Sequence, residues 1–385
     1  MFGKLRPVGN RVPRPDCSSR PGLIWEDHYR TEFTGSGTEA LSIAVAIAIA
    51  HKPEVRKPEV VIPAYGCPDL VSAILAQGGK PVLVDLLPDS PFMNDVQVRG
   101  VITPETVAVV GVNFLGISER LDVLLKVCRE KNLFLIEDSA QRFPPVSSNK
   151  PLADLVVLSF GRGKPINLMG GGALLYRKGC VTESMSVIGR YEVSVLAMGF
   201  TWLFKRWIFN LLLARFPFYV LEKLPGLGIG DTTFRPLGTI RRLAIPEDLL
   251  GAGLRDFQQR PAIDRLYDRE LAFLDKRGWK RLGRGACESR GYDSYRRGPR
   301  YAILAPDHEA RDRIKDALNS AGIGVSAFYS RTLPKIEGLE ALLKEGEFPV
   351  ADDFASRLLT LPCHEDVRAT DVTLIADTFR ELSRG

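Results

Sequence analysis

Between residues 38 and 177 the chain alternates short, almost wholly apolar runs with segments of helical character. Strands that are apolar on both faces belong to sheets covered on both sides, and the helices between them are the connections that parallel strands require. We therefore predict an α/β fold with a mostly parallel central sheet. The strand candidates are residues 58–63, 80–86, 106–112, 132–138, 154–160 and 171–177, and the helix candidates are residues 38–50, 72–79 and 121–131.

The length of 385 residues is more than one small core needs and suits two domains. From about residue 256 the pattern changes, because a charged helix over residues 256–278 precedes a strand and further helices. We predict a large α/β domain over residues 1–250 and a small α+β domain over residues 251–385. The first forty residues, rich in Pro and Arg, are expected to be an irregular lead-in.

Charge and cysteine content argue against several classes of protein. The net charge of +6 favours anionic partners only weakly, and the Lys and Arg residues are scattered without zinc-finger spacing, so we expect no nucleic-acid binding. The six cysteines lie far apart, which fits a reducing cytosol and predicts neither disulfides nor a metal site. The first residues lack the apolar core of a signal peptide, and we expect a cytoplasmic protein.

An aromatic-rich segment over residues 193–221 stands apart from this pattern. Lys205 and Arg206 interrupt it, so no uncharged stretch reaches the roughly 20 residues that a membrane-spanning helix needs. Two interpretations remain. We favour a helix buried against a subunit or a domain, because buried apolar helices are common in enzymes, and the alternative is an amphipathic helix lying on a membrane surface.

Three motifs lie where open α/β sheets bind ligands, at the carboxyl ends of strands and the amino ends of helices. In the first, Gly37 and Thr38 stand at the start of the long helix candidate. Free backbone N–H groups and the helix dipole favour a phosphate at such a position. Taken alone, the motif is better explained as a Ser/Thr helix cap.

The second motif is a buried strand that ends at Asp138 and is followed by Gln141. A carboxylate at such a strand end is costly to bury unless a positive group meets it. A protonated pyridine nitrogen would serve, and the carboxylate would keep the ring protonated so that it could act as an electron sink. A carboxylate that caps the next helix is an equally good alternative.

The third motif is a strand that ends at Ser159, followed by a glycine-flanked turn that carries Lys164. A lysine held in a tight turn between buried strands can be desolvated, which makes its amine nucleophilic. A surface lysine in a hairpin loop is the alternative. Together the three motifs supply a phosphate anchor, a partner for a pyridine nitrogen and a Schiff-base lysine, which are the parts that pyridoxal 5'-phosphate (PLP) requires.

With these motifs the chain resembles the DegT/DnrJ/StrS-type aminotransferases, PLP enzymes of fold type I that mostly aminate nucleotide-linked keto-sugars. The resemblance covers residues 35–177 and resumes from about residue 246, with GSGTEAL, LIEDSAQ, LSFGRGK and GGALL as its markers. It implies an aminotransferase that takes the amino group of L-glutamate, passes it to a nucleotide-linked or surface-polysaccharide keto-sugar, and forms a homodimer.

The resemblance also implies a role for each matched residue. Lys164 would bind the cofactor as a Schiff base and then move a proton between substrate and cofactor. Asp138 would pair with the pyridine nitrogen, and Gln141 would bond the phenolic oxygen of the ring. The residues that would hold the phosphate are Gly37, Thr38 and Ser159.

The chain departs from the family pattern in ways that concern its substrate. Cys67 stands where many members place an aromatic ring over the cofactor, and as a small hydrophobe it would cover the ring face. The segment 193–221 has no counterpart in the sugar enzymes, which suggests a hydrophobic or lipid-linked acceptor presented at a membrane. His364 matches a family position and is expected to have a structural role.

Two other functions remain as alternatives. A PLP-dependent sugar dehydratase would share the fold, but related dehydratases replace the Schiff-base lysine with histidine, so Lys164 argues against it. A non-catalytic PLP-fold regulator or membrane scaffold is the second alternative, which the altered turn around Lys164 and the aromatic segment leave open.

Overall fold

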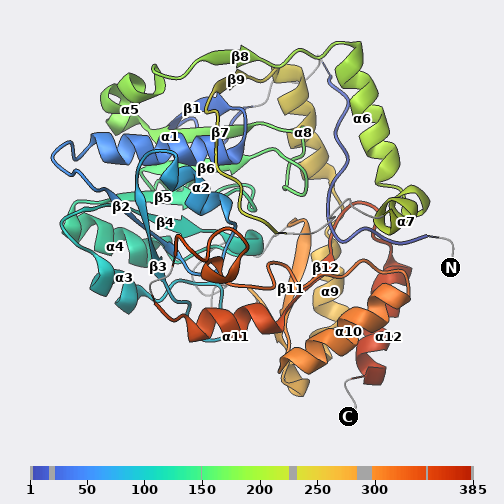
Figure 1. Ribbon diagram of the computed structural model, residues 1–385. Helices are drawn as coiled ribbons and strands as arrows, with labels where there is room; N and C mark the ends of the chain where they lie inside the picture. The colour runs from blue at the N-terminus through green and yellow to red at the C-terminus, as the bar shows by residue number, and fades with distance from the viewer. Residues whose placement is uncertain are drawn as a thin grey trace.

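A nine-stranded sheet and a three-stranded sheet organise the molecule (Figure 1). The computed structural model describes residues 3–16, 22–148, 150–224, 232–283, 297–343 and 346–382. The large sheet has the strand order β3-β2-β4-β5-β6-β7-β1-β9-β8. Its strands are β1 (Tyr29–Thr34), β2 (Glu59–Pro63), β3 (Lys80–Val84), β4 (Thr106–Val112), β5 (Phe134–Asp138), β6 (Leu155–Ser159), β7 (Gly172–Arg177), β8 (Val193–Val195) and β9 (Arg242–Ala244).

The predicted α/β fold with a mostly parallel central sheet is confirmed. Strands β2 to β6 run parallel to one another, whereas β7 is antiparallel to both β6 and β1. The carboxyl ends of the parallel strands therefore meet at one edge, which is where such sheets bind ligands.

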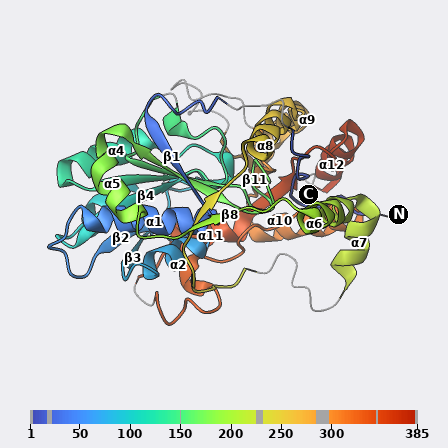
Figure 2. The same cartoon turned by 90° about the horizontal axis from the view of Figure 1, so that it is seen from above.

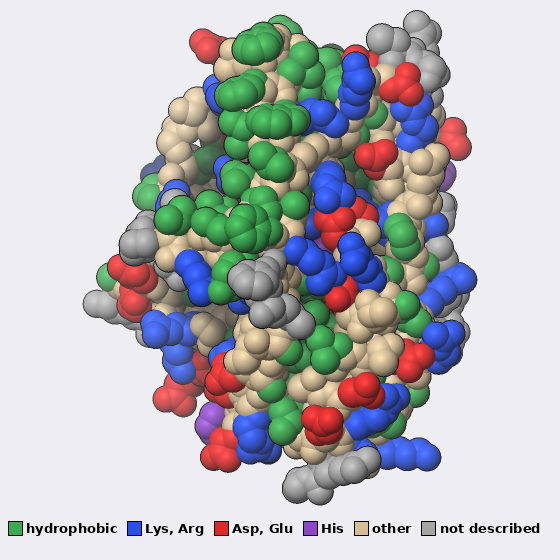
Figure 3. All heavy atoms as spheres, turned by 90° about the vertical axis from the view of Figure 1, so that its right-hand side faces the viewer, with side chains coloured by type: hydrophobic (Ala, Val, Ile, Leu, Met, Phe, Trp, Pro, Cys, Tyr) green, Lys and Arg blue, Asp and Glu red, His purple; other side chains and the backbone are tan. Residues whose placement is uncertain are grey.

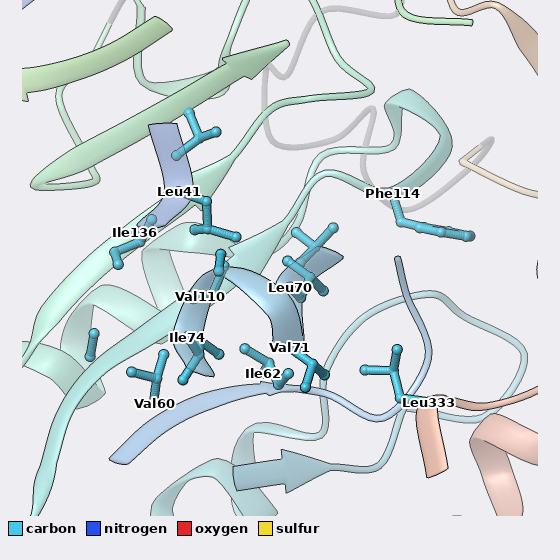
Figure 4. Close-up of a cluster of buried hydrophobic side chains, with 14 of the residues drawn as sticks. Leu41, Val60, Ile62, Leu70, Val71, Ile74, Val110, Phe114, Ile136 and Leu333 are labelled. Atoms are coloured by element: carbon cyan, nitrogen blue, oxygen red, sulfur yellow. The ribbon is translucent and has the colours of Figure 1, made fainter. Parts of the chain in front are cut away.

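Helices cover both faces of the large sheet. One face carries α1 (Gly37–Ala50), α2 (Asp69–Leu75) and α5 (Val181–Ile188), and Figure 4 shows apolar side chains of α1 and α2 packed against β2, β4 and β5. The other face carries α3 (Asp95–Val101), α4 (Leu121–Lys131) and α8 (Glu247–Gln259). Burial on both faces is the reason that the strands are apolar throughout.

Most predicted elements of the large sheet form close to the expected residues. The helix expected at residues 72–79 is the least accurate of them, because α2 begins at Asp69 and ends at Leu75. Asp69 lies in its first turn, where a carboxylate favours the helix dipole. Gly78 has φ of +70°, in the left-handed region that ends a helical path.

The expectation of an irregular lead-in over the first forty residues is wrong, because it contains β1. This strand pairs along its whole length with β7, and its Tyr29 hydroxyl donates to the Ala153 carbonyl at 2.6 Å. Its sequence, YRTEFT, mixes charged and apolar residues because its middle is only partly buried. A search for continuous apolar runs therefore misses it.

The small sheet has the order β10-β11-β12 and is antiparallel. One of its faces packs against helices in a core cluster of its own, at a distance from the large sheet (Figure 2). Ala302, Leu304 and Leu358 on its other face join the core cluster of the large sheet. Its strands are β10 (Lys280–Arg281), β11 (Arg300–Leu304) and β12 (Leu358–Pro362), and the helices beside it are α9 (Ile263–Glu270), α10 (His308–Ser320), α11 (Pro349–Arg357) and α12 (Ala369–Leu382).

The single charged helix predicted over residues 256–278 is wrong. The chain instead forms α8 up to Gln259 and α9 from Ile263. Between them Arg260 is extended, with ψ of 137°, because Pro261 disfavours the helical conformation of the residue before it and has no N–H to donate.

The N-terminal segment, residues 3–16, joins the two parts of the molecule. Leu5 packs in the core of the small sheet, and its carbonyl accepts from the Gly324 amide at 2.7 Å. Asn10 then reaches the loop between β6 and β7. The domain limits at residues 1–250 and 251–385 stay a prediction.

The aromatic-rich segment forms α6 (Phe200–Leu212) and α7 (Arg215–Lys223) at the edge of the molecule next to the N-terminal segment (Figure 1). Only Trp202 and Phe218 are buried in these helices. The favoured interpretation, a buried helix, is therefore wrong as far as burial against the rest of this chain is concerned. Burial against a second subunit stays a prediction. Across the described ranges, no helix is long and apolar enough to cross a membrane.

His364 provides a test of how the N-terminal segment is held. Its Nε2–H donates to the Arg6 carbonyl at 2.9 Å, and its Nδ1 accepts from the Asp366 amide at 3.3 Å, so the imidazole is neutral. Burial, reinforced by the Arg6 charge, lowers the pKa of His364 from 6.5 to about 3. The unfolded chain therefore takes up a proton on this residue as the pH falls below about 6.5, which the folded chain does not do until near pH 3.

We expect this protonation to destabilise the wild type by up to about 1.4 kcal/mol per pH unit as the pH falls from 6.5 to 5. In His364→Gln this contribution is absent, so the difference in unfolding free energy between the two proteins should shrink over that range. Urea titrations at each pH would measure it, with the exposed His308→Gln as a control. A difference that does not change with pH would contradict the prediction.

Candidate active site

One cavity of about 180 Å³ lies at the carboxyl ends of β2, β4, β5 and β6 and the amino end of α1. It collects all the residues that the sequence predicted for the site: Gly37, Thr38, Cys67, Asp138, Gln141, Ser159 and Lys164. Nine further lining residues had no predicted role, and four of them have polar or aromatic side chains. These are Ser36, Asp69, Asn113 and Phe114, which also follow strand ends or precede a helix, so the same rule could have found them.

The amino end of α1 sits directly on the end of β6. A Cβ atom added to Gly37 would lie 2.6 Å from the Cβ atom of Ser159. A Cβ atom added to Gly172, the register partner of Ser159, would lie 2.5 Å from the carbonyl carbon of Ser36. The two glycines thus let backbone meet backbone and place the first-turn amides of α1 beside the Ser159 hydroxyl, an arrangement that suits a phosphate.

Thr38 has a partner in this arrangement. Its hydroxyl donates to the Asp69 carboxylate at 3.0 Å. A phosphate that took this hydroxyl as a donor would therefore compete with Asp69. The Ser36 side chain is engaged as well, because it caps α1 by accepting from the Glu39 amide at 3.1 Å. The backbone amides and Ser159 are the less encumbered donors.

Two adjacent carboxylates at the end of β5 have very different surroundings. Glu137 is fully buried and accepts from the Asn113 side chain at 2.8 Å and the Ser139 hydroxyl at 2.6 Å, and also from two backbone amides. Asp138 accepts only from the Ala140 amide, at 2.9 Å, and none of the described ion pairs includes it. Burial raises the pKa of Asp138, and Lys164 partly offsets this effect. Among the described residues, Asp138 has no cation at ion-pair distance.

Gln141 reaches the cavity from the turn after β5. Its side-chain oxygen accepts from the Leu115 amide at 3.0 Å, which fixes the orientation of the amide group. Within the described part of the chain its Nε2 has no acceptor, so this group can donate to a ligand.

The loop that carries Lys164 is held from two directions. The Lys164 carbonyl accepts from the Asn10 side chain at 3.2 Å, and the Asn10 carbonyl accepts from Asn167 at 2.6 Å. From α8, Arg260 donates to the Pro165 carbonyl at 2.9 Å. These contacts fix the backbone of the loop while the Lys164 side chain lines the cavity.

Cys67 closes part of the cavity wall. Burial, followed by the nearby Asp69 charge, raises the pKa of the Cys67 thiol to about 11, and Tyr329 shares a side-chain hydrogen bond with it. The thiol is therefore protonated at neutral pH. A neutral, half-buried thiol behaves as a small apolar group, as the sequence led us to expect.

These features fit PLP on three independent grounds. Two glycines open a phosphate cradle at a helix amino end, a carboxylate without a cation lies at a strand end, and a lysine lines the same cavity. The ring nitrogen of PLP is the kind of cation that Asp138 lacks, and Lys164 is the only lysine among the residues that line this cavity. Fold and site together define a PLP-dependent enzyme.

The chain belongs to the DegT/DnrJ/EryC1/StrS aminotransferase family, whose model matches residues 31–201 and 255–380. It is 26% identical, over 92% of its own length and 85% of the relative, to a dTDP-4-dehydro-2,3,6-trideoxy-D-glucose 4-aminotransferase of Saccharopolyspora spinosa. The predicted family resemblance is thereby confirmed. The chain is an aminotransferase that uses PLP.

Solved structures share the fold. PseC of Helicobacter pylori, an aminotransferase involved in the biosynthesis of pseudoaminic acid, superposes with a TM-score of 0.70 at 18% identity, covering 98% of this chain and 99% of PseC. Spr1654 of Streptococcus pneumoniae, solved in its PLP form, gives a TM-score of 0.64 at 18% identity, covering 97% and 98%. The family match leaves out residues 202–254, which contain most of α6 and all of α7.

Gly37 can be tested by adding one methyl group. We expect Gly37→Ala to push Ser159 away from α1 and to weaken PLP binding about tenfold, because overpacking typically costs about 1–3 kcal/mol. Absorbance titration with PLP would measure the change. Gly100→Ala is the matched control, since a Cβ atom there meets nothing within 4 Å. Equal affinity in both variants would show that the cradle tolerates the methyl group.

Proposed function

We propose that this enzyme transfers the amino group of L-glutamate to the keto group of a nucleotide-linked or surface-polysaccharide sugar. The observation that carries the proposal is the joint placement of Lys164, Asp138 and the amino end of α1 around one cavity. The keto-sugar named for the Saccharopolyspora relative supports the acceptor class.

In this proposal the cavity residues hold the cofactor by its three polar ends. Asp138 binds the ring nitrogen, and Gln141 donates to the phenolic oxygen through Nε2. The phosphate is held by Gly37, Thr38 and Ser159, and Cys67 lies against the ring face. When bound, PLP supplies an electron sink for the bond that breaks at the substrate carbon.

Lys164 is the proposed acid–base residue of both half-reactions. Its amine would anchor the cofactor and, once displaced by the amino donor, would take a proton at the donor carbon and return it at the cofactor. The anchored loop keeps this amine within the cavity while the substrate changes. A lysine that can accept and release the proton suits amino transfer, whereas the dehydratase alternative has histidine there.

Lys164→Ala gives a direct test. We expect the purified wild type to show the absorbance band of a PLP Schiff base, which L-glutamate abolishes as the amino group moves to the cofactor. In Lys164→Ala the band should be absent or altered, and transamination should fall by at least about a thousandfold, since both covalent anchoring and proton transfer are lost.

Lys57→Ala, at an exposed lysine, is the control and should behave as wild type. If the wild type shows no such band with excess PLP, the enzyme proposal fails and the non-catalytic scaffold gains support. If the band forms but glutamate leaves it unchanged, another amino donor is required.

We further propose that the enzyme is a homodimer in the cytoplasm. Homodimers are the usual state that the family resemblance implies. None of the cysteines in the described part of the chain, which are Cys67, Cys128, Cys180 and Cys363, forms a disulfide, and this suits a reducing compartment.

We also propose that α6 and α7 rest on the inner face of the membrane. Phe200, Phe204 and Trp207 form a stripe along α6, with exposed fractions of 83%, 50% and 58% and successive ring centroids 6.2 Å apart. Phe216 and Val220 continue the exposed apolar surface on α7. Figure 3, which faces this side of the molecule, shows hydrophobic side chains gathered in a patch with Lys and Arg nearby.

The charges beside the stripe favour an anionic lipid surface over a second protein subunit. Lys205 and Lys223 are exposed on the two helices, and Glu222 is neutralised by Lys4 at 2.7 Å. Apolar aromatic residues flanked by lysines are typical of helices that lie in a membrane interface. The opposite side of α6 is tied down, because Arg206 donates to the Pro13 carbonyl at 2.7 Å and Asn210 pairs with Val12.

Flotation with liposomes that contain anionic phospholipid would test this surface. We expect the wild type to float, and Phe204→Ser/Trp207→Ser to lose most of its binding, because each buried aromatic side chain contributes about 1.5–3 kcal/mol. Val96→Ser, which removes an exposed apolar residue elsewhere, is the control. A wholly unbound wild type would contradict the proposal. Light scattering that showed the double variant to be monomeric, beside a dimeric wild type, would assign the stripe to a subunit interface.

A further inference from the structure

A second cavity, of about 680 Å³, lies between the large and small parts of the molecule. Its walls come from the N-terminal segment at Pro7 and Val8, from α7 at Phe218, and from the loop over residues 324–331. It contains none of the residues predicted for the cofactor. The aromatic-rich segment thus contributes to a cavity that the motif analysis did not predict.

Tyr329 stands between this cavity and the active site. It lines the second cavity, and it shares a side-chain hydrogen bond with Cys67, which lines the first. Its φ of +43° is in the left-handed region, which is uncommon for a bulky residue. Strain of this kind tends to be retained at ligand-binding sites. The two cavities are therefore neighbours across one tyrosine.

Arg300, the first residue of β11, lines the second cavity without an acidic partner. One of its terminal nitrogens, Nη1, donates to the hydroxyls of Ser326 at 2.7 Å and Thr360 at 3.0 Å. Its guanidinium lies 4.4 Å from the centroid of the Phe328 ring. None of the ion pairs among described residues includes Arg300, and neither Nε nor Nη2 has an acceptor there.

Burial lowers the pKa of Arg300 to about 10, so the group still carries its charge at neutral pH. The hydroxyls and the ring hold the guanidinium in place but leave its charge uncompensated. A fixed guanidinium with two free donors matches the geometry of a carboxylate or phosphate, which it can bind in a bidentate manner.

We propose that Arg300 forms an oxyanion subsite for the substrate, in the cavity beside the cofactor pocket. The subsite rests on the proposed aminotransferase function, since it gives that reaction a place for a charged part of the substrate. Two substrates carry such a group: the amino donor has carboxylates, and a nucleotide-linked acceptor has a diphosphate.

Other charges at the cavity agree with this assignment. Glu222 is at the wall but is paired with Lys4, and Glu337 is exposed. Arg331 is a second, exposed arginine at the cavity. The cavity therefore has two arginines against one unpaired carboxylate, which favours an anionic ligand.

The test uses the full chain loaded with PLP and three variants. Arg300→Met removes the charge, Arg300→Lys keeps the charge without the planar fork, and Arg313→Gln on the exposed face of α10 is the control. Thermal melting shows which variants are folded. Binding of UDP and of dTDP is measured by calorimetry, and the donor is tested by the rate at which L-glutamate consumes the PLP absorbance band.

We expect Arg300→Met to weaken either nucleoside diphosphate binding or the glutamate half-reaction by about 10- to 100-fold, with Arg300→Lys in between. A loss confined to UDP or dTDP assigns the subsite to the acceptor, and a loss confined to glutamate assigns it to the donor. If Arg300→Met does not fold, the same loss in folded Arg300→Lys supports the subsite.

The subsite is overturned if folded variants match Arg313→Gln within twofold in both measurements, or if the wild type binds neither diphosphate and does not react with glutamate. Failure of the aminotransferase proposal would look different. In that case the PLP band would persist with glutamate, while UDP or dTDP binding would still respond to Arg300.

Discussion

The contact between the amino end of α1 and the end of β6 is the constraint on which the site depends. Gly37 and Gly172 allow backbone atoms to meet where any side chain would collide with Ser159 or Ser36. This contact fixes the position of the first-turn amides of α1 relative to β5 and β6. It therefore also fixes their position relative to Asp138 and to the loop that carries Lys164. Because α1 is buried along most of its length, the cradle belongs to the rigid core.

Around that fixed centre, the chain adds features of its own. The N-terminal segment contacts α7 at Lys4 and the small sheet at Leu5, reaches the Lys164 loop through Asn10, and then pairs with α6 at Val12. The aromatic-rich segment is thus connected to the Lys164 loop through Val12 and Asn10, and it also lines the cavity that holds Arg300. The N-terminal segment therefore connects the Lys164 loop with α6.

The residues that the motifs predicted for the cofactor line one cavity because each follows a buried strand or precedes a buried helix. Parallel strands carry such positions to one edge, so residues far apart in the sequence meet there. Other features escaped prediction for physical reasons: β1 is half-exposed and has no apolar run, and Pro261 divides a helix that charge patterning joined. The difference in hydrogen bonding between Glu137 and Asp138 depends on donors from distant loops, which a local sequence pattern cannot predict.

The sequence by itself determined the α/β sheet, the family and seven of the residues that line one cavity, because burial periodicity and strand-end motifs are local properties of the chain. Only the tertiary structure decided that Thr38 is bound to Asp69, that Asn10 holds the Lys164 loop, and that Arg300 forms no ion pair with a described residue. These contacts join side chains that are far apart in the sequence, and only the packing of the whole chain brings such side chains together.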